Sequence, residues 1–231
     1  MKKQIFTMSL LLFFGVGLYA QPKVVGEPRV LAKMTDEPMQ TPVWSPDGSK
    51  LFLNNGTLEI SGNGTDLRRV SAPVSNLRRM AATAAANSLF QQMISDPVNV
   101  ASQVQGLQSL SGNLIFSAAL SPTGDKIAFE AGNKGLYVIN ADGTGLRSFG
   151  FGVGNATWTA DGNYVVVQQV EDDGYFFTKG ELKSINVETG ARSVLFSSDK
   201  FITLSPAISP DGKRIAFEEY LSGAVYIMDI Q

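Results

Sequence analysis

The sequence contains no cysteine and no histidine. Their absence excludes disulfides, zinc fingers, thiol nucleophiles, Ser-His-Asp triads and haem ligation through either side chain. Basic residues are also in short supply, because 19 Lys and Arg stand against 21 Asp and Glu. A protein that binds nucleic-acid phosphates needs a basic surface, so this slight excess of acidic residues argues against nucleic-acid binding. With 231 residues, 44% of them hydrophobic, the chain has ample material for a core.

Long hydrophobic runs are confined to the N-terminus. Lys2 and Lys3 form a short basic start, residues 5–18 are mostly apolar, and Leu18-Tyr19-Ala20 offers a cleavage site. A membrane-spanning helix needs ~20 apolar residues, so a signal peptide is favoured over a retained anchor. We expect cleavage after Ala20, a periplasmic or secreted location, and a mature domain of residues 21–231 that is not an integral membrane protein.

An internal repeat carries the main structural signal. Four segments share an apolar residue followed by turn residues: Trp44-Ser45-Pro46-Asp47-Gly48, Leu120-Ser121-Pro122-Thr123-Gly124, Trp158-Thr159-Ala160-Asp161-Gly162 and Ile208-Ser209-Pro210-Asp211-Gly212. The flanking residues are β-branched or aromatic and alternate at period two, which is typical of paired strands. A second hairpin follows at 57–70, 135–149 and 183–196. Each unit therefore predicts four short antiparallel strands, the blade of a β-propeller.

The last unit lacks its fourth strand. Ala224–Asp229 has the pattern of a third strand, and Arg29–Met34 has that of an outer strand standing before the first turn motif. A propeller closes when one terminus supplies a strand to the blade begun by the other, which removes an open sheet edge. We predict that Arg29–Met34 pairs with Ala224–Asp229.

These motifs resemble the TolB-type propeller repeat, in which a Ser-Pro-Asp-Gly turn precedes Lys/Arg-Ile-Ala-Phe and a second Asp-Gly turn. Ser209–Phe217 matches nearly in full, Ser45–Leu53 and Ser121–Phe129 are close, and Thr159–Val167 is more divergent. The resemblance covers residues 28–71 and 114–231 and implies an all-β propeller. TolB's separate N-terminal α/β domain and six blades have no counterpart here, so its Tol–Pal role is not implied.

The spacing of the repeats bears on the number of blades. The turn Ser and Thr residues stand at 45, 121, 159 and 209, so the first interval is twice the second. The intervening segment, about 75–112, is rich in alanine and has helical spacing, and Ser95-Asp96-Pro97 is typical of a helix start. We predict four blades with a helical insertion at about 75–112, whose second helix runs through Gln105. Five blades, one of them degenerate, remain the alternative.

The two irregular segments, the insertion and the loop 168–180, are expected on the face opposite the Ser-Pro-Asp-Gly turns. Loops on a rigid scaffold commonly carry binding residues, although neutral insertions are also tolerated. Four polar residues at equivalent blade positions would form a ring on that face, suited to a cation, a sugar or a peptide amine, unless they are solvated strand ends. The ring residues are Asn54, Glu130, Gln168 and Glu218, and the loop adds Glu171, Asp172, Asp173, Tyr175, Phe176 and Phe177.

No catalytic residue, metal or cofactor is predicted. Asn140–Gly145 resembles the start of a calcium loop, but Phe151 stands where a bidentate glutamate is needed. The leading hypothesis is a non-catalytic binding or assembly module of the cell envelope with a protein or peptide partner. The alternatives are a carboxylate-based glycosidase or lyase, and an accessory propeller for a separate peptidase or transporter. An enzyme predicts two acids about 5–10 Å apart in an apolar pocket, whereas a binding module predicts exposed aromatics.

Overall fold

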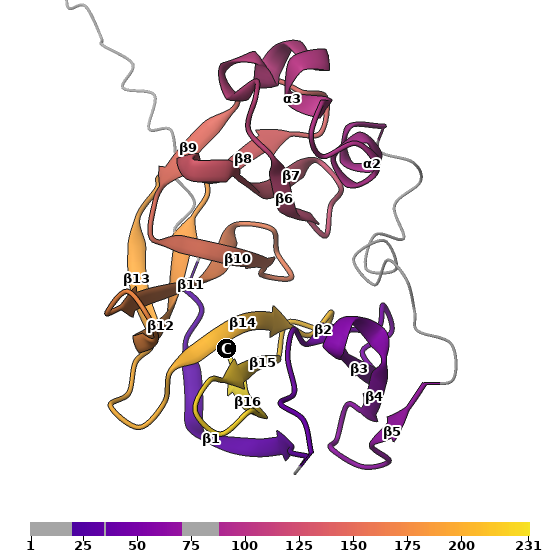
Figure 1. Cartoon of the computed structure of the whole chain (residues 1–231), viewed down its shortest axis with the longest axis vertical. Helices are drawn as coiled ribbons and strands as arrows, with labels where there is room; N and C mark the ends of the chain where they lie inside the picture. Colours follow the sequence, from indigo (N-terminus) through magenta and orange to yellow (C-terminus); the bar gives the residue numbers. More distant parts are fainter. Residues whose placement is uncertain (1–19, 35, 71–87) are drawn as a thin grey trace, which may run out of the picture.

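The computed structural model of the chain describes residues 20–34, 36–70 and 88–231. Its strands form four four-stranded antiparallel sheets, arranged as the four blades of a β-propeller (Figure 1). The predicted signal peptide falls almost entirely outside the described residues. Within them, no helix is long and apolar enough to cross a bilayer.

Each blade runs from an inner strand at the centre of the disc to an outer strand at its rim. Blade 1 consists of β2 (Val43–Trp44), β3 (Lys50–Leu53), β4 (Leu58–Ser61) and β5 (Arg68–Arg69), and blade 2 of β6 (Ile115–Leu120), β7 (Lys126–Ala131), β8 (Gly135–Asn140) and β9 (Arg147–Gly150). Blade 3 consists of β10 (Val153–Trp158), β11 (Tyr164–Asp172), β12 (Phe177–Asn186) and β13 (Arg192–Phe196). Blade 4 consists of β14 (Thr203–Ile208), β15 (Arg214–Glu219) and β16 (Ala224–Ile230), completed by β1 (Val24–Ala32).

The predicted closure of the ring is confirmed. Strand β1 pairs antiparallel with β16, with Val30 opposite Tyr226 and Arg29 opposite Ile227. The Arg29 guanidinium also contacts the Asp229 carboxylate at 3.2 Å. The strand begins at Val24 and ends at Ala32, earlier than the predicted Arg29–Met34.

Three of the junctions between blades are built by direct packing of one sheet on the next. In β15, Ile215 and Phe217 pack with side chains of blade 3, whereas Ala216 packs with side chains of blade 1. This division follows from the period of two, which sends successive strand residues to opposite faces. The same alternation builds the junction of blades 2 and 3, where Trp158 of β10 also donates its indole N–H to the Ala119 carbonyl.

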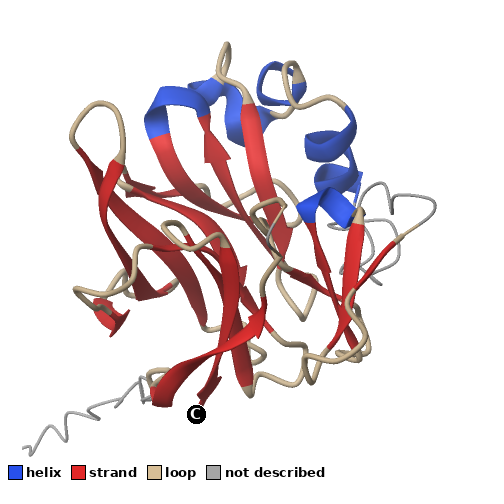
Figure 2. Ribbon diagram, turned by 60° about the horizontal axis from the view of Figure 1, so that its bottom comes forward, coloured by secondary structure: helices blue, strands red, loops and turns tan. Residues whose placement is uncertain are grey.

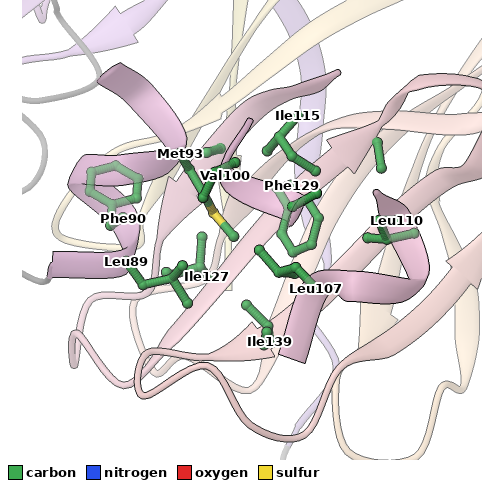
Figure 3. Close-up of a cluster of buried hydrophobic side chains, with 13 residues drawn as sticks. Leu89, Phe90, Met93, Val100, Leu107, Leu110, Ile115, Ile127, Phe129 and Ile139 are labelled. Carbon is green, nitrogen blue, oxygen red and sulfur yellow. The ribbon is translucent and has the colours of Figure 1, made fainter. Parts of the chain in front are cut away.

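The fourth junction, between blades 1 and 2, is built differently. The described part of the insertion forms α2 (Ser88–Ser95), α3 (Val100–Gln103) and the 3-10 helix η2 (Gln105–Leu110). These helices gather along one side of the strands (Figure 2). Their apolar side chains, among them Phe90, Met93 and Leu107, pack on Ile127 and Phe129 of blade 2 (Figure 3). The insertion therefore covers the sheet face that, in the other blades, meets the preceding blade.

The prediction of four blades is confirmed, and the five-bladed alternative is wrong. Residues 88–113 contain no strand, and their helices take the place of a further blade beside blade 2. The predicted second helix starts later than expected: residues 97–99 form a turn, and α3 begins at Val100. The predicted helical residues 75–87 lie outside the described part of the chain.

Candidate functional site

The two faces of the disc differ in chemistry. One face, here the turn face, carries the first-to-second and third-to-fourth turns of each blade. The other, here the loop face, carries the second-to-third turns and the connections between blades. This division follows from the up-and-down order of the strands in every blade.

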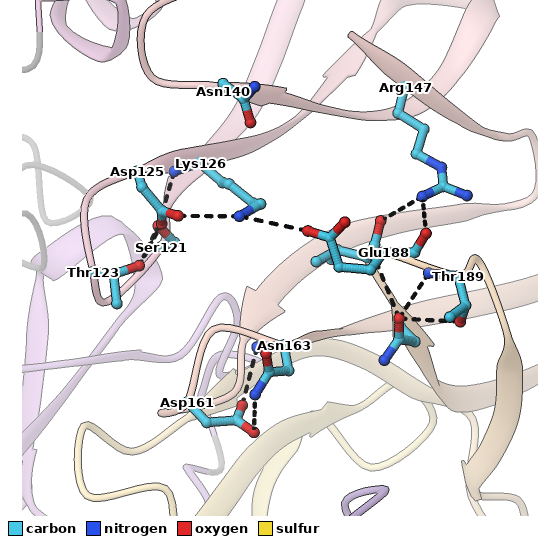
Figure 4. Close-up of polar contacts among 12 residues, drawn as sticks. Ser121, Thr123, Asp125, Lys126, Asn140, Arg147, Asp161, Asn163, Glu188 and Thr189 are labelled. Carbon is cyan, nitrogen blue, oxygen red and sulfur yellow. Dashed lines mark hydrogen bonds and ion pairs between the residues drawn. The ribbon is translucent and has the colours of Figure 1, made fainter. Parts of the chain in front are cut away.

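Carboxylates on the turn face hold the turns together. The Ser45 hydroxyl donates to Asp47 at 2.6 Å, and the Ser49 N–H donates to the same oxygen. These hydrogen bonds, first of all that of Ser45, lower the pKa of Asp47 to about 2. Figure 4 shows the same chemistry at blades 2 and 3, where Thr123 donates to Asp125 and Asn163 to Asp161. These acids have a structural role in the turns.

The predicted polar ring is not a cluster of side chains facing one another. Glu130 of blade 2 accepts a hydrogen bond from the Asn155 N–H of blade 3 at 2.8 Å. Gln168 of blade 3 accepts one from the Ser205 N–H of blade 4 at 2.7 Å. Each of these side chains therefore links the end of its second strand to the inner strand of the next blade.

Glu218 makes the corresponding link from blade 4 to blade 1. Its carboxylate lies 3.5 Å from the Thr41 N–H and also bonds the Ser205 hydroxyl. The side chain is buried, and removal from water raises the pKa of its carboxyl above the ordinary glutamate value despite these hydrogen bonds. Burial thus favours the neutral acid at this junction.

Asn54 of blade 1 departs from this pattern. Its side chain turns back to its own blade, accepting from the Gln40 N–H at 2.6 Å and donating to the Pro38 carbonyl at 3.0 Å. An asparagine is one methylene shorter than the glutamine and glutamates of the other blades. The link is therefore replaced by a local bond at the junction that the insertion fills.

Four equivalent inner-strand residues escaped the sequence analysis. Three of them receive these links, and the fourth, Ser117, receives none from Asn54. Each lies in or just before the inner strand of its blade and has a left-handed backbone, with φ between 48° and 52°: Thr41, Ser117, Asn155 and Ser205. In β6, β10 and β14 the pairing register shifts at this residue, which marks a β-bulge. The available signal was their shared position, three residues before the apolar residue of each turn motif.

The predicted loop 168–180 is mostly strand. Strands β11 and β12 stay paired out to Asp172 and Phe177, so the tip is a short turn on a two-stranded arm. The Asp173 carboxylate accepts from the Tyr175 and Phe176 N–H groups, both at 2.9 Å, which lowers its pKa. Tyr175 is 88% exposed and Phe176 is 65% exposed.

The rest of the arm rests on blade 4. The Phe177 ring packs edge-on against Tyr220 at 5.3 Å between ring centroids. Lys179 pairs with Glu181 at 2.9 Å and lies 3.9 Å from Glu171. The base of the arm is therefore held against blade 4. At its tip the rings of Tyr175 and Phe176 are exposed to solvent, with acidic residues beside them.

Exposed apolar side chains gather on the loop face. Among the described residues, those that the strand order assigns to this face are Leu114, Phe116, Phe151, Tyr175, Phe176 and Leu221, while Val98 lies in the turn between the insertion helices α2 and α3. The remaining exposed large apolar residues, Val25, Val30 and Val194, lie on the outermost strands β1 and β13. The turn face has none among the residues described. A one-sided distribution of this kind is typical of an interaction surface.

The insertion does not lie on the loop face alone. The prediction that it shares this face with the segment 168–180 is therefore wrong. Gly106 of η2 lies against the Gly143 backbone, which belongs to a turn-face turn. At the other end, the Ile115 N–H donates to the Pro97 carbonyl at the start of β6, on the loop-face side. The insertion spans the thickness of the disc because its apolar side chains cover the open sheet of blade 2.

A cavity of about 720 Å³ occupies the centre of the disc. All four inner strands contribute to its wall, and α2 adds Met93 and Ile94. No acidic or basic side chain lines it within the described ranges, and no group of three acids that could hold a metal ion is found there. The paired acids expected of a carboxylate-based enzyme are therefore absent from this wall.

No protein-family model matches the chain, and no curated protein matches its sequence. Among solved structures it is similar to a putative TolB from Agrobacterium tumefaciens, at 20% identity and a TM-score of 0.41, over 86% of this chain and 60% of that one. It is also similar to the Cps50 (Swd1) β-propeller domain of Myceliophteria thermophila, at 12% identity and a TM-score of 0.41, over 84% and 54%. The chain thus spans between half and two thirds of these proteins. The TolB-type repeat remains a prediction from the motifs.

The buried Glu218 gives a pH-dependent prediction. Because its folded pKa is raised, the folded state holds its proton more tightly than the unfolded state does, and stability falls as pH rises through the raised pKa. Glu218→Gln removes this titration and keeps an acceptor for Thr41, as Gln168 does for Ser205. We expect this variant to be more stable than the wild type at pH 7, with the gain vanishing below about pH 4.

Denaturant unfolding at several pH values measures this effect. Glu218→Ala is the matched variant, because it removes both the titration and the acceptor. We expect it to lose about 1 kcal/mol relative to Glu218→Gln at pH 7. A Glu218→Gln gain that persists unchanged at pH 4 would contradict the argument.

Proposed function

We propose that this protein is a non-catalytic binding module of the cell envelope that docks a protein or peptide partner on its loop face. The observation that carries the proposal is the pair of exposed aromatic rings, Tyr175 and Phe176, on the β11–β12 arm. The N-terminal leader, with its predicted cleavage after Ala20, supports an exported protein. The Ser-Pro-Asp-Gly repeat and its TolB-like pattern support an envelope propeller.

The arm is suited to docking because it is ordered before any partner arrives. Its strands are paired to the tip, Asp173 holds the turn, and Phe177 anchors the base on Tyr220. Aromatic side chains on an ordered support lose little conformational freedom on binding. Phe151 and Leu221, also exposed on the loop face, would extend the contact.

The charges on the arm indicate the chemistry of the partner. Glu171 and Asp172 flank the aromatic tip and are exposed. Such a surface is complementary to a segment that carries apolar side chains together with Lys or Arg. We therefore expect a basic, apolar partner segment, with association that weakens as salt concentration rises.

Site-specific photo-crosslinking tests this proposal. Phe176 is replaced by photoreactive benzoylphenylalanine in the mature chain, and Val194 in a matched control, since both are exposed apolar residues on different surfaces. The proteins are incubated with envelope extract, irradiated, and the adducts identified by mass spectrometry. We expect a defined adduct at Phe176 whose crosslinked peptide is basic.

A second set of variants tests the energy of the contact. Tyr175→Ser with Phe176→Ser should weaken binding of the identified partner by at least roughly tenfold, because such aromatic contacts dominate interfaces. The control, Val30→Ser with Val194→Ser, should bind like the wild type. Equal crosslinking at positions 176 and 194, or equal affinity of the two double variants, would overturn the proposal.

A further inference from the structure

We infer that the central cavity is a binding site for an uncharged organic ligand that carries both apolar and hydrogen-bonding groups. Its volume of about 720 Å³ lies within the range typical of small-molecule sites, roughly 300–1,000 Å³. The inference does not depend on the partner proposed for the loop face, since the cavity is lined by residues of the four inner strands, β2, β6, β10 and β14.

Part of the apolar wall of the cavity comes from the junction of blades 1 and 2, which the insertion fills. Met93 and Ile94 of α2 line it together with Val43 of β2. Met93 belongs to the core that fixes the insertion on blade 2, and Ile94 packs at the edge of that core. Helix α2 is thus fixed on blade 2 by its core contacts while it lines the cavity. Its contribution makes the cavity asymmetric, since the rest of the ring is built from inner strands.

The hydrogen-bonding groups of the wall come from the four left-handed positions, one in each blade. Thr41, Ser117, Asn155 and Ser205 all line the cavity, and each brings a hydroxyl or an amide. The Ser117 hydroxyl is 3.3 Å from the Asn155 side-chain oxygen, a contact between neighbouring blades. Between these groups the wall is made of small residues, such as Ala119 and Ala156, which leave room for a ligand.

The absence of charge in the described wall selects the class of ligand. The nearest acids by position, Glu130 and Glu218, face the N–H groups of the next blade, and neither lines the cavity. An ionised ligand would leave water without gaining a counter-charge, which is strongly unfavourable. A neutral ligand with hydroxyl or carbonyl groups would instead exchange its water contacts for those of Thr41, Ser117 and Asn155, since the Ser205 hydroxyl is already bonded to Glu218.

Two fluorescent probes that differ by one charged group provide the test. N-phenylnaphthylamine is neutral, and anilinonaphthalene sulfonate adds a sulfonate to the same ring system. The probes are titrated into the folded mature chain, with fluorescence measured as each probe leaves water. We expect the neutral probe to bind with one site per chain, and the sulfonate to bind at least roughly tenfold more weakly.

Charge substitutions test whether the neutral probe binds in the cavity. Ile94→Lys puts a charge into the wall, whereas Gln92→Lys puts the same charge on the exposed side of α2. We expect Ile94→Lys to weaken the neutral probe at least roughly fivefold and to improve the sulfonate, and Gln92→Lys to change neither. If Ile94→Lys does not fold, Val43→Asp puts a negative charge into the wall from β2 and should weaken both probes, whereas its near-isosteric control Val43→Thr should weaken neither comparably.

If both probes bind with equal affinity, or if folded charge variants of Ile94 and Val43 retain wild-type affinity for the neutral probe, the cavity is not the site inferred here. Circular dichroism and thermal melting of each variant establish that the comparison is made between folded proteins.

Discussion

Replacing Phe129 by alanine is expected to lower the free energy of unfolding by about 3–5 kcal/mol, the usual cost of removing a buried phenylalanine. Phe129 of β7 is fully buried against the insertion helices, and its ring stacks on that of Tyr137 with 5.8 Å between the ring centroids. Its loss would leave a cavity beneath Leu107, since the surrounding helices and sheet can relax only in part. Denaturant unfolding followed by circular dichroism measures the change.

The chain supplies a matched control for this experiment. Phe217 occupies the same repeat position in blade 4, is fully buried, and stacks on Tyr226 at 5.9 Å. It packs against a true neighbouring blade, whereas Phe129 packs against the insertion. Equal losses for Phe129→Ala and Phe217→Ala would show that the insertion replaces a blade energetically. A loss below about 1 kcal/mol for Phe129 alone would contradict this view.

Deleting residues 21–33 is expected to have an even larger effect, because it removes β1 from blade 4. Strand β16 would then expose a row of unpaired backbone groups along its outer edge. Ala32 would also leave the core shared by blades 1 and 4. We expect the melting temperature to fall by at least about 10 °C, together with a tendency to aggregate.

Adding the missing strand in trans separates loss of closure from general damage. A synthetic peptide of residues 20–34 should raise the melting temperature progressively, with the logarithm of its concentration once that exceeds the dissociation constant, as mass action requires. The same peptide with Val25→Pro cannot donate the backbone hydrogen bond that the register places between Val25 and Asp229, and it should restore less. If the deleted chain melts like the full one without any peptide, the ring does not depend on β1.

Much of the fold could be predicted because its signals are local and repeated. Pro46-Asp47-Gly48 and Pro210-Asp211-Gly212 favour turns through the φ preferences of proline and glycine, wherever they stand in a chain. The alternating residues beside them fix which side chains enter the core. The closure by β1 could be predicted by counting strands. The N-terminal end has one strand more than blade 1 needs, and the C-terminal blade has one strand fewer than the other blades.

The candidate site was predicted less completely. The exposure of Tyr175 and Phe176 agrees with the binding hypothesis, but Glu130 and Gln168 proved to be hydrogen-bonded to the next blade. The sequence gives their equivalence around the ring but not their partners. A side chain at the end of a strand has the same local pattern whether it meets water or another blade.

The sequence by itself therefore determined the repeat, the strands and turns within each blade, and the strand that closes the ring. Tertiary structure alone decided where the insertion lies, because the face it covers exists only once blade 2 has folded. It also decided the character of the central cavity, whose wall joins α2 to four inner strands far apart in the chain. Periodicity reports contacts between neighbours in sequence, whereas a cavity is defined by residues that meet only when the ring closes.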